Sequence, residues 1–213
     1  MKLTVFGATG LVGKHVVKQA LAKGHTVIAF GRNIESLIDA DLDSENLIAL
    51  RGYVFDEESV YNAVKDSEAV ISVLGGGFDG VDKTRSLGIK NIITQMNKAG
   101  IKRIVALGNL AVLDASQGTM IIDTPAYPAE FLPVGREHVQ ALLYLKESDL
   151  NWTMVGAPNL LDEPATGKYL TAANHPPSPN AGKINAGNLA LFMLSEISKN
   201  QFIKERVGIS NEA

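Results

Sequence analysis

Residues 2–13 read Lys2-Leu3-Thr4-Val5-Phe6-Gly7-Ala8-Thr9-Gly10-Leu11-Val12-Gly13, and the rest of the fold can be predicted outward from them. The apolar run from Leu3 to Phe6 is typical of a short β-strand. Apolar residues at helical spacing then run from Val12 to Leu21 and predict an α-helix. The three glycines between the two patterns predict a tight turn. The stretch therefore indicates a strand, a turn and a helix in succession.

Each glycine of this turn has its own physical role. Gly7 lets the chain reverse at the end of the strand, and Gly10 removes a side chain where a pyrophosphate would approach the backbone. Gly13 lets the helix and the strand pack closely. Phosphates would then bind the unpaired N–H groups at the start of the helix. A second strand pattern follows at 26–30, and this context favours dinucleotide binding over a glycine turn with a purely steric role.

Composition narrows the class of protein. The chain has 213 residues, of which 46% are hydrophobic and 20% charged, with a net charge of −3, so neither disorder nor a surface for nucleic acid is expected. It has no cysteine, which excludes disulfides and cysteine-ligated metals, and we expect no metal site. No apolar run is long enough to span a membrane, and the early strand leaves no room for a signal peptide. We therefore expect a soluble, cytoplasmic protein.

Short apolar runs alternate with longer amphipathic ones along the chain. This alternation predicts an α/β fold of Rossmann-like type, a doubly wound parallel sheet with helices on both faces, and a small loop-rich substrate region toward the C-terminus. We expect one NAD(P)-binding domain over residues 1–213. The predicted strands are residues 3–6, 26–30, 47–50, 69–73, 103–107, 152–155 and 206–209.

Three helices can be delimited from local signals. Asp56 is a candidate N-cap for a helix that ends at Val64, with acidic residues in its first turn. A long helix over about 84–98 should end at Gly100, and another should cover about 135–147.

Two proline-containing stretches lack clean periodicity. Residues 115–133 and 162–180 are predicted to be loops, the second with a short strand-like run at 168–171. Both follow strands whose carboxyl ends would point at the cofactor crevice, so we interpret the wider segments 109–133 and 159–184 as the substrate side.

The residues after the second predicted strand bear on which nicotinamide cofactor would bind. A carboxylate there would repel a 2′-phosphate, whereas an arginine accommodates it. The chain has Arg32 and Asn33 at this position and no acidic residue before Glu35. Because Arg32 offers a fork of donors and Asn33 adds another, the sequence favours NADP(H) over NAD(H). The alternative is that Arg32 is only a solvated surface charge.

The fingerprint at 7–13 with Arg32 resembles that of the atypical branch of the short-chain dehydrogenase/reductase superfamily. The likeness continues through 69–75, 102–107 and 145–155, and it covers nearly the whole chain. Pro158 and the segment 162–169 are similar to the region after the sixth strand in the biliverdin-IXβ reductase and NADPH-flavin reductase group. NmrA-like proteins are close neighbours of that group.

This resemblance implies a set of cofactor contacts. Arg32 would bind the 2′-phosphate, while Tyr53 and Val54 stand where many relatives place an aspartate beside the adenine. Histidine and serine positions of the family are taken here by Asn159 and by Gly108-Asn109. The remaining implied contacts, from the pyrophosphate through the adenosine to the nicotinamide, are Gly7, Thr9, Gly10, Leu11, Val12, Gly13, Leu74, Gly75, Leu107, Pro158 and Leu160.

The usual proton donor of the superfamily has no counterpart in the sequence. That donor is a tyrosine four residues before a lysine, whereas Tyr144 is followed by Lys146 two residues later. We interpret Tyr144 as a residue buried against the sheet. The missing pair argues against ordinary ketone chemistry and leaves acceptors that take hydride without a dedicated acid, namely flavins, quinones and conjugated tetrapyrroles.

Three residues are candidates for contact with such an acceptor. Asn109 and Asn159 could orient a carbonyl but cannot titrate, and Asn109 could equally tie down the loop after its strand. The resemblance implies that His138 lies on a helix bordering the nicotinamide. Its neighbours Arg136 and Glu137 are read as a surface ion pair.

Aromatic and glycine residues near the expected site each allow two interpretations. The rings of Phe78, Tyr127, Phe131 and Tyr169 are predicted on loops, where they could stack on a flat acceptor or anchor the loops. The triplet at 75–77 could let the backbone approach the cofactor or act as a hinge.

Two functional hypotheses remain from the sequence. The first is an NADPH-dependent oxidoreductase that reduces a small planar acceptor. The second is an NADP(H)-sensing regulator of the NmrA-like type that binds without turnover. An isomerase or epimerase is a weaker third, because it too would want the missing pair. The sequence predicts no oligomeric state.

Overall fold

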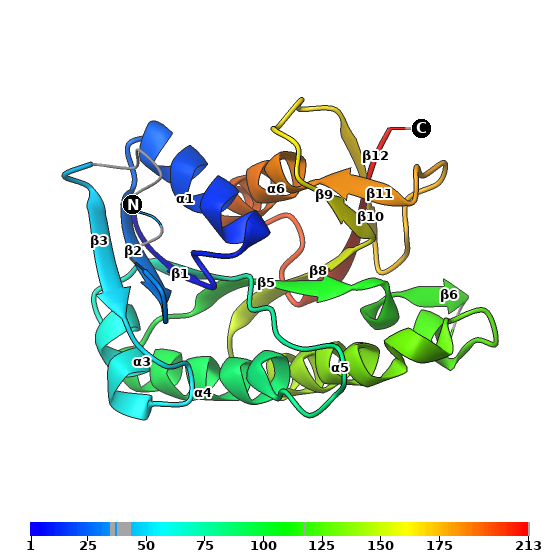
Figure 1. Ribbon diagram of the computed structural model, residues 1–213, viewed down its shortest axis with the longest axis horizontal. Helices are drawn as coiled ribbons and strands as arrows, with labels where there is room; N and C mark the ends of the chain where they lie inside the picture. Colours follow the sequence, from blue (N-terminus) through cyan, green and yellow to red (C-terminus); the bar gives the residue numbers. More distant parts are fainter. Residues whose placement is uncertain (35–36, 38–43, 117, 213) are drawn as a thin grey trace.

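The computed structural model describes residues 1–34, 37, 44–116 and 118–212. An eight-stranded sheet lies at its centre, with the strand order β10-β12-β8-β5-β4-β1-β2-β3 (Figure 1). All neighbours in it are parallel except β10, which pairs antiparallel with β12 at one edge. The strands are β1 (Lys2–Phe6), β2 (Thr26–Gly31), β3 (Leu47–Arg51), β4 (Ala69–Ser72), β5 (Arg103–Asn109), β8 (Asn151–Ala157), β10 (Tyr169–Ala173) and β12 (Glu205–Asn211).

The order of the strands fixes where a ligand can bind. From β1 the chain continues outward to β2 and β3, and it then returns to place β4, β5, β8 and β12 on the other side of β1. Phe6, at the end of β1, lies opposite both Phe30 of β2 and Ser72 of β4. The carboxyl ends of β1 and β4 therefore flank the point where the winding direction reverses, which is the usual binding crevice of such sheets.

Helices cover both faces of the sheet, as the hydrophobic pattern predicted. The helices α1 (Leu11–Ala22) and α6 (Ala186–Lys199) pack on one face. On the other face lie α3 (Glu57–Val64), α4 (Thr84–Ala99) and α5 (Leu132–Lys146) (Figure 1). Each face has its own buried apolar cluster, so the predicted doubly wound Rossmann-like fold is confirmed.

Two predicted helix ends, the start of α3 and the end of α4, are confirmed. The Asp56 carboxylate accepts a hydrogen bond from the Ser59 N–H at 2.7 Å, as an N-cap of α3 should. Gly100 closes α4 with φ +74°, the left-handed conformation that favours glycine. The helix α6 is not among the helices predicted from local signals.

The first irregular stretch, 115–133, is more structured than predicted. Its described residues include the end of β6 (Asp114–Ser116), the antiparallel partner β7 (Thr119–Met120) and two 3-10 turns. These are η2 (Ile121–Asp123) and η3 (Ala129–Phe131), and a further turn, η1 (Leu110–Val112), follows β5. The helix α5 begins at Leu132 rather than near Gly135, because Pro133 lies in its first turn, where the missing N–H has no helical partner.

The second irregular stretch, 162–180, contains a strand that the sequence analysis placed only in part. This strand, β10, forms the antiparallel edge, and beside it β9 (Asn159–Leu161) pairs with β11 (Lys183–Asn185). Tyr169 therefore lies in a strand and not on a loop, and its ring packs edge-on against Phe192 with centroids 6.1 Å apart. Such short pairings depend on contacts between segments distant in sequence, which periodicity does not register.

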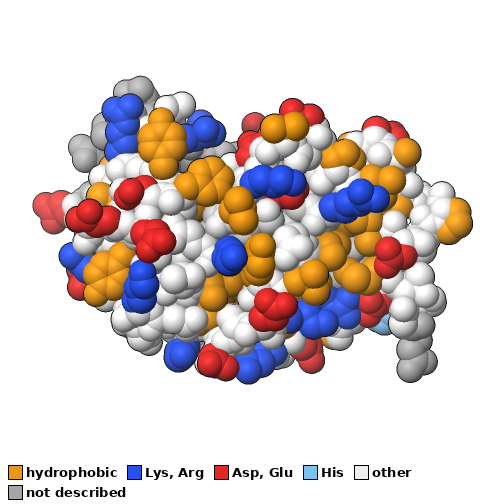
Figure 2. Space-filling view, turned by 90° about the horizontal axis from the view of Figure 1, so that it is seen from below, with side chains coloured by type: hydrophobic (Ala, Val, Ile, Leu, Met, Phe, Trp, Pro, Cys, Tyr) orange, Lys and Arg blue, Asp and Glu red, His pale blue; other side chains and the backbone are white. Residues whose placement is uncertain are grey.

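The surface over α3, α4 and α5 has a mixed character. Figure 2 shows positive and negative side chains interspersed on this face, with apolar side chains between them. In the part of the chain that the structure describes, none of the helices has both the length and the apolar content needed to cross a bilayer.

Candidate cofactor and acceptor site

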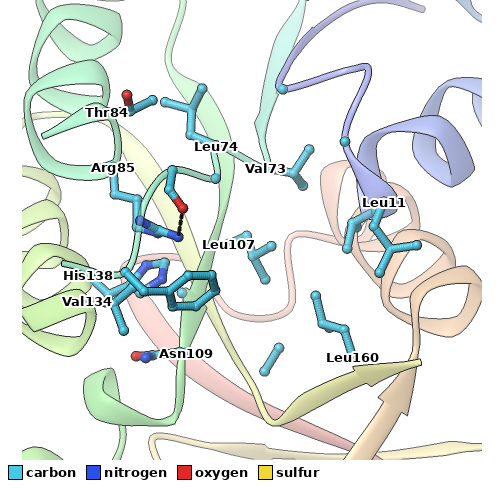
Figure 3. A pocket seen from close by; sticks show the side chains of 18 of the residues that line it. Leu11, Val73, Leu74, Thr84, Arg85, Leu107, Asn109, Val134, His138 and Leu160 are labelled. Atoms are coloured by element: carbon cyan, nitrogen blue, oxygen red, sulfur yellow. Dashed lines mark hydrogen bonds between the residues drawn. The ribbon is translucent and has the colours of Figure 1, made fainter. Parts of the chain in front are cut away.

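A cavity of about 1000 Å³ lies at the carboxyl ends of β1, β4, β5 and β8. Its walls come from the β1–α1 turn, the ends of β2 and β3, the segment between β4 and α4, and the segment from 107 to 138, with 157–160 opposite. Figure 3 shows Arg85, Val134 and His138 on one wall, across Leu107 from Leu11 and Leu160. The cavity therefore occupies the crevice that the strand order predicts.

The β1–α1 turn presents backbone donors to this cavity. Gly7 has φ +80°, and its carbonyl accepts the Gly10 N–H at 3.0 Å. Among the described residues, the N–H groups of Leu11, Val12 and Gly13 donate to no carbonyl, and the N-cap Gly10 supplies no side chain. Unpaired amides at a helix start with no side chain above them fit an anionic diphosphate.

Gly13 has a different position from the other glycines of the motif. A Cβ built there would lie 2.1 Å from the carbonyl oxygen of Gly7, so the residue sits against the turn and does not line the cavity. A Cβ at Gly10 would meet that oxygen at 3.3 Å, while the Gly10 backbone itself lines the cavity. Gly13 thus shapes the turn, and Gly10 leaves room for a ligand.

The part of the cavity beyond β2 and β3 contains the residues from which the sequence predicts the choice of cofactor. Arg32 is exposed and lines the cavity just beyond β2, whereas Asn33 does not line it. Tyr53 also lines it and is 64% exposed, with the buried Val54 beside it. Glu35 lies outside the described residues. An exposed guanidinium at this place fits a 2′-phosphate.

Most of the predicted cofactor contacts are brought together here. Besides Gly13 and Asn33, every one of them lines the cavity: Gly7, Thr9, Gly10, Leu11, Val12, Arg32, Tyr53, Val54, Leu74, Gly75, Leu107, Gly108, Pro158 and Leu160.

The glycine-rich segment after β4 is held in place by side chains of its own neighbourhood. Gly77 N–H donates to Asp82 Oδ2 at 2.9 Å. Arg85 donates from Nη1 to the Gly77 carbonyl at 2.8 Å and from Nη2 to the Gly76 carbonyl at 3.0 Å. Its guanidinium also lies 5.6 Å from the centre of the Phe78 ring. These contacts favour close backbone approach over a hinge.

Arg85 is a site residue that the sequence analysis missed. Its side chain lines the cavity, although the residue is only 7% exposed. A signal was present, because a basic residue in the first turn of a helix opposes the helix dipole and so needs a local reason. Here α4 begins at Thr84, directly before Arg85, with Lys83 preceding it.

Asn109 is fixed by two hydrogen bonds at the end of β5. Its Oδ1 accepts the Ala111 N–H at 3.1 Å, and its Nδ2 donates to the hydroxyl of Tyr127 at 3.2 Å. Burial raises the pKa of Tyr127, while the hydrogen bond from Asn109 acts in the opposite direction. Asn109 therefore anchors the loop and also holds a phenol hydroxyl at the cavity, so the two interpretations of this residue are not exclusive.

His138 lies on the α5 wall as a buried imidazole. It is 7% exposed, and its buried Nδ1 has no hydrogen-bond partner within the described residues. Burial, and then the positive charge of Arg85, lower the pKa of His138 to about 3. The ring is therefore neutral near pH 7 and can exchange hydrogen bonds, but it is not an imidazolium acid. Asn159, exposed on β9, also lines the cavity, so all three candidates for acceptor contact meet there.

The expected surface ion pair between Arg136 and Glu137 is wrong. Glu137 is only 5% exposed, and its carboxylate accepts hydrogen bonds from Lys83 Nζ at 2.8 Å and from the hydroxyl of Ser86. Arg136 is exposed on the other side of α5. Adjacent helical residues point about 100° apart, so one faces α4 and the other faces solvent.

The structure places no tyrosine and lysine pair on the α5 wall. The cavity-lining positions of α5 that are four residues apart are Val134 and His138. Tyr144 is partly buried away from the cavity, with Lys90 Nζ 5.3 Å from its ring centre. Among the residues that the structure describes, no three side chains of His, Cys, Asp or Glu gather into a metal site.

Comparisons with known proteins agree with this geometry. The family model described as NAD(P)H-binding matches residues 7–200. YwnB of Bacillus subtilis, whose activity is not established, is 26% identical over the full length of both chains. A solved structure from Streptococcus pneumoniae, for which NADH-flavin reductase is the suggested activity, is 27% identical over all of both chains with a TM-score of 0.84.

A third comparison concerns the fold alone. The short-chain dehydrogenase/reductase of Veillonella parvula, solved in complex with NADP, superposes with a TM-score of 0.77 at 16% identity, over all of this chain and 95% of that one. The family itself is shown by the family model, which covers nearly the whole chain. The protein belongs to the NAD(P)H-binding family, within the atypical short-chain dehydrogenase/reductase superfamily.

Proposed function

We propose that the protein is an NADPH-dependent oxidoreductase that transfers hydride to a flat conjugated acceptor such as a flavin or a quinone. The observation that carries this proposal is the cavity itself, which runs from the amide-rich β1–α1 turn to an acceptor end with no tyrosine and lysine pair among the described residues. The segments 109–133 and 159–184 would form the acceptor side of one cofactor-binding unit.

The residues present fit a nicotinamide dinucleotide phosphate. The free amides at Leu11 and Val12 would hold the diphosphate, and the exposed guanidinium of Arg32 would hold the 2′-phosphate. When bound, the reduced cofactor supplies the hydride. The preference for NADPH rests on Arg32, since the suggested activity of the Streptococcus pneumoniae protein names NADH.

The protein would act mainly by position at the acceptor end. The rings of Phe78 and Phe131 line the cavity and offer flat apolar surface to a conjugated acceptor. The Tyr127 hydroxyl, held by Asn109, and the neutral His138 offer hydrogen bonds to a carbonyl or ring nitrogen. Holding the acceptor within about 3.5 Å of the hydride donor, away from water, is most of what such a transfer needs.

Steady-state oxidation of NADPH by the purified protein tests the proposal. We expect turnover with riboflavin, riboflavin phosphate or a set of quinones, and little with simple ketones and aldehydes of similar size. The matched control is the protein with Gly10→Ala, which should bind the cofactor weakly and lose turnover with every acceptor. Rates no higher than the background reaction for all acceptors would contradict the proposal.

A second candidate is an NADP(H)-sensing regulator of the NmrA-like type. It is favoured by the internal hydrogen bonds that already engage Asn109 and by the neutral state of His138, which leave few groups for chemistry. This candidate predicts binding of the dinucleotide without turnover, and a protein partner that is retained in the presence of one redox form only.

A further inference from the structure

Arg85 supplies positive charge at the acceptor end of the cavity. It shares the α5-side wall with His138, whose pKa it helps to lower, and Figure 3 shows the two side chains close together. The other arginine of the lining is Arg32, at the adenosine end. Within the described part of the chain, no aspartate or glutamate lines the cavity. The acceptor end is therefore an electropositive, mostly apolar space.

No carboxylate that lines the cavity neutralises the charge of Arg85, among the residues that the structure describes. Its two hydrogen bonds go to neutral carbonyls, and the carboxylates that attract it are Asp82 and Glu137. Asp82 already accepts the N–H groups of Gly77 and Thr84, and Glu137 already accepts Lys83 and Ser86. Burial lowers the pKa of Arg85, but a guanidinium stays charged in proteins.

The acceptor end as a whole is a poor source of protons. The pKa of His138 is lowered to about 3 and that of Tyr127 is raised, so neither group readily releases a proton near pH 7. Asn109 and Asn159 do not titrate. A site with a buried cation and weak acids suits a reaction whose product is negatively charged.

We propose that the site reduces acceptors whose hydride adduct is a stable anion, and that Arg85 stabilises the negative charge as it forms. This inference rests on the proposed oxidoreductase function. In the step, the C4–H bond of the dihydronicotinamide breaks with its electron pair, and that pair forms the new N5–H bond of a flavin. The displaced ring electrons move to the N1–C2 carbonyl region, so the donor becomes a cation and the acceptor an anion. No proton enters, and water protonates the product after release.

This charge balance separates the acceptor classes. The anions of reduced flavins and hydroquinones are much weaker bases than an alkoxide, because their negative charge is delocalised over a conjugated system. A nearby guanidinium is therefore sufficient to stabilise them while the hydride is transferred. Reduction of a simple ketone gives a strongly basic alkoxide, which needs a proton during the transfer. The acceptor end should therefore accept flavins and quinones and reject unconjugated carbonyl compounds.

Substitution of Arg85 tests the electrostatic role. Arg85→Met keeps the length of the side chain and removes its charge, and we expect kcat to fall at least about tenfold, most for quinones whose hydroquinones are the weakest acids. Arg85→Lys keeps the charge but cannot bridge the carbonyls of Gly76 and Gly77 with one planar group, and it should recover most of the rate. The control is Arg136→Met, the same change on the exposed side of α5.

A binding measurement supplies a readout that does not depend on turnover. With saturating NADP⁺ present, calorimetric titration compares neutral 1,4-naphthoquinone with the anion of 2-hydroxy-1,4-naphthoquinone. Arg85→Met should weaken binding of the anion at least about tenfold and leave the neutral ring nearly unchanged. Arg136→Met should change neither affinity.

Several results would overturn this role of Arg85. One such result is that Arg85→Met and Arg85→Lys lower kcat by the same factor for all acceptors and weaken the binding of both naphthoquinones equally. That would show that Arg85 acts by fixing the 75–77 segment. Another is that Arg85→Met raises KM for riboflavin phosphate but not for riboflavin. That would show that Arg85 binds the phosphate group of the acceptor and not the charge formed in the reaction. Absence of turnover in the unsubstituted protein would refute the proposed function, whereas turnover with an unchanged Arg85→Met rate would refute only this inference.

Discussion

The two ends of the cavity are built from different materials. The end proposed to hold the diphosphate consists of backbone amides and glycines within one short stretch, 7–13, followed by the exposed Arg32. The acceptor end is assembled from side chains of separate segments, including Arg85, Asn109 and His138. A site made of backbone demands particular residues at fixed spacing, whereas a site made of side chains demands only that distant segments meet. Substitutions at the two ends should therefore fail in different ways.

The largest expected effect tests whether dinucleotide binding depends on the backbone conformation of the β1–α1 turn. In Gly13→Ala the new Cβ would lie 2.1 Å from the Gly7 carbonyl, so the turn must move. We expect a loss of unfolding free energy of about 3 kcal/mol, by overpacking, and loss of dinucleotide binding. Urea denaturation followed by circular dichroism, together with calorimetric titration of NADPH, measures both.

Gly10→Ala is the matched comparison at the same turn. Gly10 has an extended backbone, φ −75° and ψ 172°, which alanine adopts freely, and its Cβ would have 3.3 Å to the nearest atom. We expect nearly unchanged stability with NADPH binding weakened about tenfold or more, because the methyl group occupies the phosphate position. If both substitutions destabilised the protein equally, the separation of roles between the two glycines would be wrong.

The next largest effect concerns Arg32, the side chain on which the proposed preference for NADPH over NADH rests. Arg32→Ala should weaken NADPH binding by about 2 kcal/mol, the scale of hydrogen bonds to a charged group, and leave NADH binding nearly unchanged. Parallel titrations with the two cofactors decide this. An equal loss for both would show that Arg32 does not contact the 2′-phosphate, and Lys14→Ala, on the exposed side of α1, serves as the control for lost surface charge.

The smallest expected effect comes from the acceptor end and appears as a pH dependence. The pKa of His138 falls from an ordinary 6.5 to about 3 in the folded protein. Between these values the unfolded chain binds a proton that the folded chain does not, so stability decreases as the pH falls below 6.5. The slope from this group is at most about 1.4 kcal/mol per pH unit.

Denaturation of the unsubstituted protein and of His138→Gln at pH 7 and pH 5 measures this contribution. The glutamine variant should lose less stability over the interval, because it has no group that titrates there. His25→Gln is the control, since the pKa of His25 is also lowered, chiefly by burial, but the residue is only partly buried. Identical pH dependence in the His138→Gln variant and the unsubstituted protein would contradict a buried neutral imidazole.

The sequence allowed the fold to be predicted where local physics decides it. The β1–α1 turn, the N-cap at Asp56 and the left-handed Gly100 depend on residues within one or two turns of chain. The pairing of β9 with β11, and the edge position of β10 with Tyr169, depend on partners 24 or more residues away. Periodicity contains no information about such partners, so these elements were missed or only partly placed.

The candidate site could likewise be predicted from the sequence only where local motifs decide it. The predicted cofactor contacts came from the fingerprint and from the family resemblance, and nearly all of these residues line one cavity. Arg85, and the hydrogen bond from Asn109 to Tyr127, arise only when α4, β5 and the 121–131 segment are packed together. Glu137 is a residue for which the local pattern misled. Arg136 and Glu137 are oppositely charged neighbours in sequence, but they could form a surface pair only if the helix exposed both side chains, and Glu137 is buried against α4.

The buried carboxylate of Glu137 has a consequence for how this cavity could diversify. It joins α5 to Ser86 of α4 and to Lys83, directly before α4, so the two helices that bear His138 and Arg85 are linked to each other. The opposite wall, at 157–160, reads Ala-Pro-Asn-Leu and contains no charged side chain. The wall with Arg85 and His138 therefore holds its charge in a fixed position, and the opposite wall can change by mutation to suit acceptors of a new shape while that charge stays the same.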